Sequence, residues 1–224
     1  MLIAEDLLLL LTDDRSGKAT VAAQRLAFAL AGGVLVELLL LGRLTITQEG
    51  SRARVALTGA APVGDPMLDG ALQRIAGKRQ PVLAQTVVTT LARDLPDAVR
   101  ARLVARGILR EEHGRVLGVF PTHAWPAADS THEEAVRRAL WDVIVVGRTP
   151  SDREVCLVAL LQAVDQVPKQ FAVEGMSARQ LRERAKAMSA GNVGGDAVRR
   201  AVQATEAAVA ASMAASAAVM ASSS

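Results

Sequence analysis

The chain has 224 residues, half of them hydrophobic, which is enough to bury a sizeable core in one large domain or two small ones. With three Phe, two Trp and no Tyr, that core must consist of Leu, Val and Ala, which pack well between helices. The 26 Lys and Arg exceed the 23 Asp and Glu by too little to indicate nucleic-acid binding, although a local basic patch can still contact phosphates.

The N-terminal segment MLIAEDLLLLLTDD has no basic n-region and carries Glu5 and Asp6 ahead of its leucines. We therefore expect mature cytoplasmic sequence rather than a signal peptide. Cys156 lies in the apolar run REVCLVALL and is predicted to be a small buried residue. The excess of alanine, and of arginine over lysine, is typical of a bacterial protein.

In chain order, residues 2–11 are predicted to form a short helix or a buried strand, followed by a turn at 13–17. The next segment, 26–41, is apolar on every side except for Glu37. It is shorter than the ~20 residues that span a bilayer, and a carboxylate near its middle would be costly in lipid. We therefore predict a buried helix that ends at Gly42 and on which a helical bundle packs.

Two features of segment 26–41 predict its contacts. Gly32 and Gly33 each cost about 1 kcal/mol relative to alanine in a helix interior, so the pair indicates that another helix crosses closely. Glu37 could be a functional buried acid. The favoured interpretation is a structural acid that pairs with Arg43 or with an arginine of another helix.

Alternation of apolar and polar residues predicts a β-hairpin over 44–57 with its turn at 49–50. Asp65 is then expected as the N-cap, and Pro66 as the first residue, of a helix that reaches about residue 77.

Further helices are predicted over 81–93 and 96–107, followed by a second hairpin over 108–120 whose turn is placed at His113-Gly114. Helices 131–146, 152–165 and 177–188 each follow a serine with capping-box spacing. The three pairs are Ser130 with Glu133, Ser151 with Glu154, and Ser177 with Gln180. The alanine-rich segment 190–224 is predicted to be a last helix with a frayed end, packed on its own bundle or on a partner.

Catalysis finds little support. The chain has no Walker-type glycine loop and no GxSxG, CxxC or HExxH motif, so we predict no catalytic residue, no cofactor and no metal site. His113, His123 and His132 are expected to have surface or loop roles.

Arginine is dense between residues 93 and 115, and it is the side chain that binds phosphate bidentately. The members are Arg93, Arg100, Arg102, Arg106, Arg110 and Arg115. Arg102 and Arg106 are four residues apart and repel each other unless an anion lies between them. The cluster therefore indicates either an anion site or the solvated face of an amphipathic helix.

Four segments together resemble the Golgi phosphoprotein 3-like family, and the match extends from residue 7 to about 209. They are VELLLLGRL (36–44), APVGDPMLDGAL (61–72), RLVARGIL (102–109) and CLVALLQAVDQV (156–167). The resemblance implies one mainly α-helical domain over 1–224, in which a central helix is surrounded by amphipathic helices and a hairpin serves self-association. It also implies a peripheral membrane adaptor without catalytic activity, because the eukaryotic members bind phosphatidylinositol 4-phosphate on Golgi membranes and hold glycosyltransferases there.

The family's head-group positions, a tryptophan and three arginines, fall on Ala22, Ala31, Arg93 and Pro96. Only Arg93 keeps the family residue, and Arg100, one helical turn beyond Pro96, is the proposed substitute. The sequence thus predicts an anionic-lipid head-group site with Arg93 and Arg100, on the cytoplasmic face of a membrane.

Two alternatives remain open: a cytosolic scaffold that self-associates through the hairpin at 108–120, and a winged-helix-like nucleic-acid-binding regulator. The small net charge counts against nucleic acid as a partner.

Overall fold

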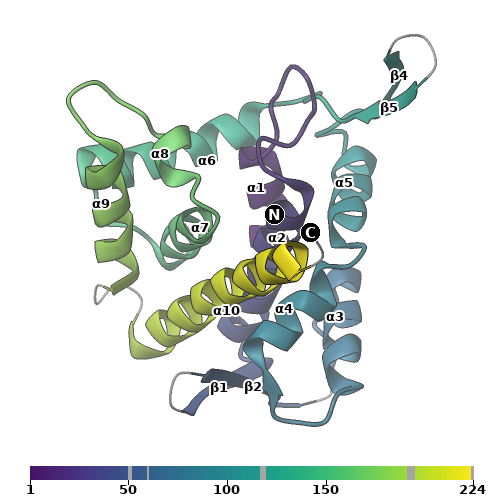
Figure 1. Cartoon of the computed structure of the whole chain (residues 1–224), viewed down its shortest axis with the longest axis vertical. Coiled ribbons are helices and arrows are strands. Elements are labelled where there is room, and N and C mark those ends of the chain that lie inside the picture. The colour runs from purple at the N-terminus through teal and green to yellow at the C-terminus, as the bar shows by residue number, and fades with distance from the viewer. Residues whose placement is uncertain (50–51, 60, 117–119, 191–194, 223–224) are drawn as a thin grey trace.

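The computed structural model of the chain describes residues 1–49, 52–59, 61–116, 120–190 and 195–222. Within these residues the fold is mainly α-helical with two small antiparallel sheets, as predicted (Figure 1). The helices are α1 (Ile3–Leu10), α2 (Ala23–Leu40), α3 (Pro66–Ala76), α4 (Ala84–Ala92), α5 (Leu95–Ala105), α6 (Thr131–Trp141), the π-helix η1 (Asp142–Val146), α7 (Asp152–Ala163), α8 (Val167–Gln170), α9 (Ala178–Ala190) and α10 (Gly195–Ser222). The strands are β1 (Leu44–Glu49), β2 (Arg52–Leu57), β3 (Val82–Leu83), β4 (Glu112–Val116) and β5 (Phe120–Ala124).

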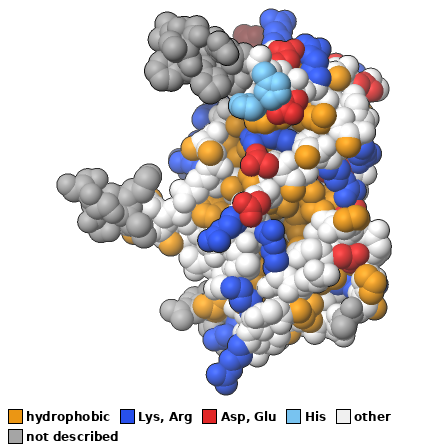
Figure 2. Space-filling view, turned by 90° about the vertical axis from the view of Figure 1, so that its right-hand side faces the viewer, with side chains coloured by type: hydrophobic (Ala, Val, Ile, Leu, Met, Phe, Trp, Pro, Cys, Tyr) orange, Lys and Arg blue, Asp and Glu red, His pale blue; other side chains and the backbone are white. Residues whose placement is uncertain are grey.

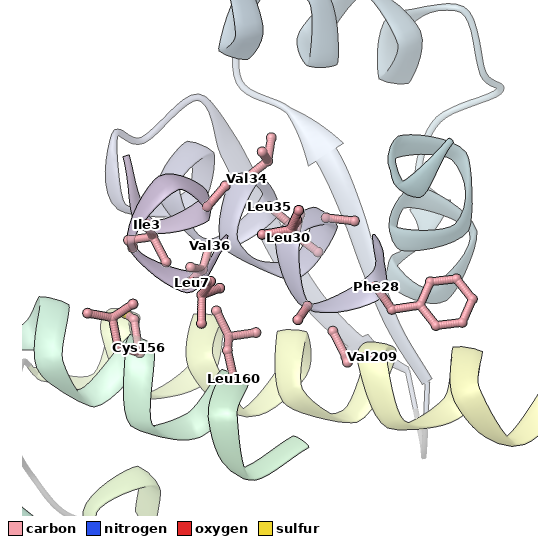
Figure 3. Packing of buried hydrophobic residues seen from close by; sticks show 14 of the residues in the cluster. Ile3, Leu7, Phe28, Leu30, Val34, Leu35, Val36, Cys156, Leu160 and Val209 are labelled. Carbon is pink, nitrogen blue, oxygen red and sulfur yellow. The ribbon is translucent and has the colours of Figure 1, made fainter. Parts of the chain in front are cut away.

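The centre of the bundle holds two helices. α2 packs against α1, α4, α5, α7 and α10, which confirms the apolar segment 26–41 as the core helix. α1 lies beside α2 and is itself wholly buried, so residues 2–11 contain a helix and not a strand. Figure 3 shows Ile3 and Leu7 of α1 close to Val36 of α2 and to Cys156 of α7. The core therefore brings α1 and α2 together with α7, which follows much later in the sequence.

By length and composition alone, α2 is the one helix among the described residues that could cross a membrane. Most of it is buried inside the fold, as expected for the core helix of a bundle.

The glycine pair marks close crossings, as predicted. A Cβ atom at Gly32 would lie 2.7 Å from Leu160 Cδ2 and 2.8 Å from Val209 Cγ2, so α7 and α10 contact this side of α2. A Cβ atom at Gly33 would lie 3.0 Å from the backbone nitrogen of Ala4 in α1. The two glycines thus admit helices on two different sides of α2.

Glu37 has a structural role, as predicted, but it does not pair with Arg43. Its Oε2 accepts a hydrogen bond of 2.7 Å from the backbone N–H of Ile3, and Arg153 of α7 lies 3.9 Å away. Arg43 instead donates to the carbonyl of Pro62. Glu37 therefore satisfies one of the free N–H groups at the start of α1.

The first hairpin is confirmed, since β1 pairs antiparallel with β2 from Leu44–Leu57 to Glu49–Arg52. Its predicted turn includes Gly50, which lies outside the described residues. The predicted helix 81–93 begins later than expected, because residues 82–83 form β3 and pair with β2. A short run of β-branched and apolar residues fits either element, and here the neighbouring strand decides.

The second hairpin is present, but its turn is not at His113-Gly114. Both residues lie inside β4, where His113 pairs with His123 of β5. The strands join through residues 117–119, which lie outside the described part of the chain together with the predicted hairpin residue Val119. The dipeptide His-Gly looked like a turn, yet a glycine within a strand is compatible with pairing at an edge.

Two of the three capping boxes are confirmed. Ser151 Oγ accepts from the backbone N–H of Glu154, and the Glu154 carboxylate accepts from the backbone N–H of Ser151 at 2.7 Å. Ser177 and Gln180 make the same reciprocal pair, at 3.3 and 2.8 Å.

The third predicted capping box, Ser130 with Glu133, is wrong. Ser130 donates its hydroxyl to Glu134, whereas Glu133 is buried and pairs with Arg137 one turn further on. The helix predicted over 131–146 also changes to η1 for its last five residues before Gly147.

Valines and methionines recur along α10 at separations of four or seven residues and form an apolar stripe, which packs on its own bundle. Val202 and Val209 are buried, and Met213 packs against the same core. The side chains of Val198 and Met220, two further members of the stripe, lie outside the described residues.

Cys156 is buried as predicted, and burial raises the pKa of its thiol to about 12, so the thiol stays protonated and unreactive.

Candidate functional site

An open pocket of about 800 Å³ lies between α3, α5 and the end of α4. Its wall is apolar and includes a side chain of α2. The apolar lining residues are Val34, Pro66, Met67, Ala71, Leu91, Leu95, Ala98 and Ala105. The lining also contains three arginines, two aspartates and two glycines, which are Arg74, Arg102, Arg106, Asp65, Asp94, Gly64 and Gly70. On the face seen in Figure 2, hydrophobic side chains accordingly lie open between basic and acidic ones.

The sequence places the two kinds of side chain by helical spacing. α5 buries Leu95, Val99 and Leu103, which recur every four residues on one side of the helix, against the core. Arg102 and Arg106 follow on an adjacent face that meets α1 and α3. The pocket therefore combines an apolar floor with guanidinium groups at its edge.

The anion expected between Arg102 and Arg106 is an internal carboxylate. Glu5 Oε1, fully buried in α1, accepts from Arg102 Nε at 2.9 Å and from Arg106 Nη1 at 3.0 Å. Glu5 Oε2 also accepts from the backbone N–H of Leu2 at 2.5 Å. Arg106 keeps 41% of its side chain exposed beside this buried carboxylate.

Asp65 has two roles. As predicted it caps α3, accepting from the N–H groups of Met67 and Leu68. It also pairs with Arg102 through both oxygens, at 2.6 and 2.9 Å. Burial acts to raise the pKa of Asp65, but the hydrogen bonds from Arg102 and Leu68 outweigh burial and hold that pKa below its usual value. Asp65 consequently raises the pKa of Arg102, which stays charged.

Arg93 does not line this pocket but precedes a residue that does. It follows α4 directly, its side chain is exposed, and its carbonyl accepts from Arg74 Nη1 at 3.2 Å. The next residue, Asp94, lines the pocket. Arg74 and Arg93 are therefore neighbours at one edge.

Arg100 lies on another side of α5. Its Nη1 pairs with Asp97 at 2.9 Å, and its guanidinium carbon lies 4.4 Å from the ring centroid of Trp125. Only 19% of the Arg100 side chain is exposed. Arg93 and Arg100 are thus both near α5, but the structure does not bring them to one pocket.

The other positions that correspond to family head-group residues differ in burial. Ala22 is exposed at the N-cap of α2, Pro96 is half-buried in the first turn of α5, and Ala31 is completely buried in α2. A charged side chain at 31 would therefore need a partner inside the core.

Glu5 was not identified from the sequence, although it pairs with Arg102 and Arg106 at the edge of the pocket (the arginine edge). The available signal was the pair Glu5-Asp6 inside a run of leucines, since acids in a buried helix must be paired. Asp6 obeys the same rule, because it accepts from Arg153 at 2.7 Å and from His132 Nε2 at 2.8 Å.

The fold and site define a mainly helical bundle with a largely apolar pocket that has arginines in its lining. The family model for Golgi phosphoprotein 3 (GPP34) matches residues 3–205, and the chain belongs to that family.

A curated relative is "Vacuolar protein sorting-associated protein 74" from Eremothecium gossypii, which is 24% identical over 163 residues. The match covers 64% of this chain and 49% of the relative, so the chain spans about half the length of that protein.

Proposed function

We propose that the protein is a peripheral membrane adaptor without catalytic activity, which binds an anionic lipid head group at the pocket between α3 and α5. The observation that carries this proposal is the juxtaposition of an open, largely apolar pocket with Arg74 in its lining and Arg93 beside Arg74. Membership of the GPP34 family supports it. Phosphatidylinositol 4-phosphate is the first lipid to test, because the family resemblance implies it.

The proposed role of each arginine follows from the carboxylates with which it pairs. Arg102 is held by Glu5 and Asp65 and so shapes the pocket. Arg74 and Arg93 have exposed side chains, and in the described structure no carboxylate pairs with either. A phosphate at the edge would therefore contact Arg74 and Arg93, and the apolar floor would accept the adjoining lipid. Arg100 lies outside the pocket, paired with Asp97 and packed on Trp125, and is proposed as a weaker contact.

Flotation with phosphatidylcholine vesicles, with or without phosphatidylinositol 4-phosphate or phosphatidylserine, tests this function. Binding is expected only to the anionic vesicles. Arg93→Ala and Arg74→Ala are each expected to weaken it about fivefold, because one arginine near an anionic surface contributes about 1 kcal/mol. Arg100→Ala is expected to weaken it less.

The matched control is Arg179→Ala on α9, which removes one exposed positive charge far from α3 and α5 (Figure 1). It should leave flotation unchanged. Equal binding to neutral vesicles, or equal losses in Arg179→Ala and Arg93→Ala, would refute the assigned pocket.

Self-association through the hairpin at 108–120 is part of the proposal. In Figure 1, β4 and β5 project from the bundle, and a two-stranded hairpin is marginally stable without something packed on it. Deletion of residues 110–117 is expected to lower the molar mass measured by light scattering to that of one chain. An unchanged mass would remove the hairpin from the contact.

The nucleic-acid alternative gains no support from the site. The helix that a winged-helix reading would place on DNA is α5, whose Arg102 and Arg106 already pair with Glu5 and Asp65. Those carboxylates neutralise the charge that phosphates would meet.

A further inference from the structure

The β4–β5 hairpin brings three metal-ligating side chains to one face. Glu111 directly precedes β4, and its carboxylate lies on the same side as the His113 ring, with Oε1 3.8 Å from His113 Nε2. His113 lies directly opposite His123 in the antiparallel register, and opposite residues share a face. Strand geometry therefore gathers a carboxylate and two imidazoles that no sequence motif links.

The distances between these groups are close to those of a coordination shell. Glu111 Oε1 lies 3.4 Å from His123 Nδ1 and 3.8 Å from His113 Nε2, and one ligand atom from each residue lies within 4.8 Å of the other two. Ligands bonded to one tetrahedral ion at about 2.0–2.1 Å lie roughly 3.3–3.5 Å apart. All three side chains are exposed, so small rotations can close the difference and an ion can enter from solvent.

One ligand is already oriented by its neighbours. The ring of His123 is stacked on Trp125, with centroids 6.1 Å apart and planes 22° apart. Trp125 is in turn covered by Arg100, which Asp97 holds at 2.9 Å. The stacked side chains of His123, Trp125 and Arg100 therefore connect the hairpin to α5. Metal sites commonly rely on such outer contacts to orient their ligands.

We propose that Glu111, His113 and His123 bind one divalent transition-metal ion of the Zn²⁺ class. Two imidazole nitrogens and one carboxylate oxygen suit Zn²⁺, Ni²⁺, Co²⁺ or Cu²⁺, whereas Mg²⁺ and Ca²⁺ prefer oxygen ligands alone. Three protein ligands leave at least one position for water. At one end of the face in Figure 2, histidine side chains lie beside acidic ones at the surface. The site is separate from the proposed lipid pocket and does not depend on it.

Calorimetric titration of the metal-free, tag-free full chain with ZnCl₂ tests the site. We expect saturable binding of one ion per chain. Glu111→Gln and His113→Ala are each expected to weaken binding by at least about tenfold, the lower end of what loss of a supporting contact costs a metal site. All the ligand side chains are exposed, so these variants should fold like the parent protein.

Glu112→Gln is the matched control. Glu112 is the neighbour of Glu111, it points to the other face of the hairpin, and it pairs with Arg110 at 2.7 Å. The control should bind Zn²⁺ as the parent does. Cu²⁺ should also quench the tryptophan fluorescence of the parent and of Glu112→Gln, and quench it less in His113→Ala. Absence of saturable Zn²⁺ binding, or equal affinities in Glu111→Gln and Glu112→Gln, would overturn the proposal.

Discussion

Glu5→Ala is expected to lower the free energy of unfolding by about 3–5 kcal/mol, the usual cost of removing one partner from a buried ion pair. The Glu5 carboxylate is the common acceptor of Arg102, Arg106 and the backbone N–H of Leu2. Its removal leaves two guanidinium groups facing each other one helical turn apart, and a free N–H at the start of α1. Since domains are stable by only about 5–15 kcal/mol, much of the population could unfold at 37 °C.

Urea denaturation followed by circular dichroism measures this loss. Glu183→Ala is the control, because Glu183 pairs with Arg179 on the exposed surface of α9, where such pairs contribute about 0–1 kcal/mol. Glu5→Gln keeps the side-chain volume and isolates the contribution of the charge. If Glu5→Ala and Glu183→Ala cost the same, Glu5 does not hold the arginine edge.

Gly33→Val is expected to destabilise the fold by about 3 kcal/mol, at the upper end of overpacking costs. The new Cβ would lie 3.0 and 3.1 Å from the backbone N and Cα of Ala4, and 3.2 Å from Leu7 Cδ1. A side chain can rotate away, but the backbone of α1 is fixed on both sides by the ion pairs of Glu5 and Asp6. The two methyl groups of valine then have no space.

Gly70→Val is the matched control for this effect. Gly70 also lies inside a helix, α3, yet a Cβ atom there would meet nothing within 4 Å. Valine is slightly better than glycine in a helix, so the free energy of unfolding should change by less than about 0.5 kcal/mol. A thermal or urea melt that ranks the two valine variants equally would show that α1 can move away from α2.

Local signals in the sequence predicted the elements well. Asp65 and Pro66 start α3, Ser151 starts α7, and the apolar segment 26–41 forms the core, because caps and hydrophobic periodicity act within a few residues. The capping box predicted at Ser130 is wrong because Arg137 competes with Ser130 for the Glu133 carboxylate. Glu133 is buried beside Arg137 and so is not free to cap.

The site was only partly predictable, because it depends on contacts across the chain. Spacing indicated an anion between Arg102 and Arg106, but Glu5 is 97 residues away from Arg102, and no local rule connects them. Arg93 and Arg100 were grouped by sequence, whereas the helix turns Arg100 toward Trp125.

The histidines show how a small shift in register hides a cluster. With a turn at His113-Gly114, His113 could not face His123. Once the strand continues to Val116, the two histidines become cross-strand partners and Glu111 joins them. A period of two converts a displacement of a few residues into a different set of neighbours.

The burial of α1 has a consequence for how the protein is made. α1 is the first of the described helices to be synthesised, yet Asp6 must wait for Arg153, which follows 147 residues later. At about 5–20 residues per second, a leucine-rich helix stays without its final cover for roughly 7–30 seconds. During translation the nascent chain therefore offers an apolar, acid-bearing segment to chaperones until α7 has emerged.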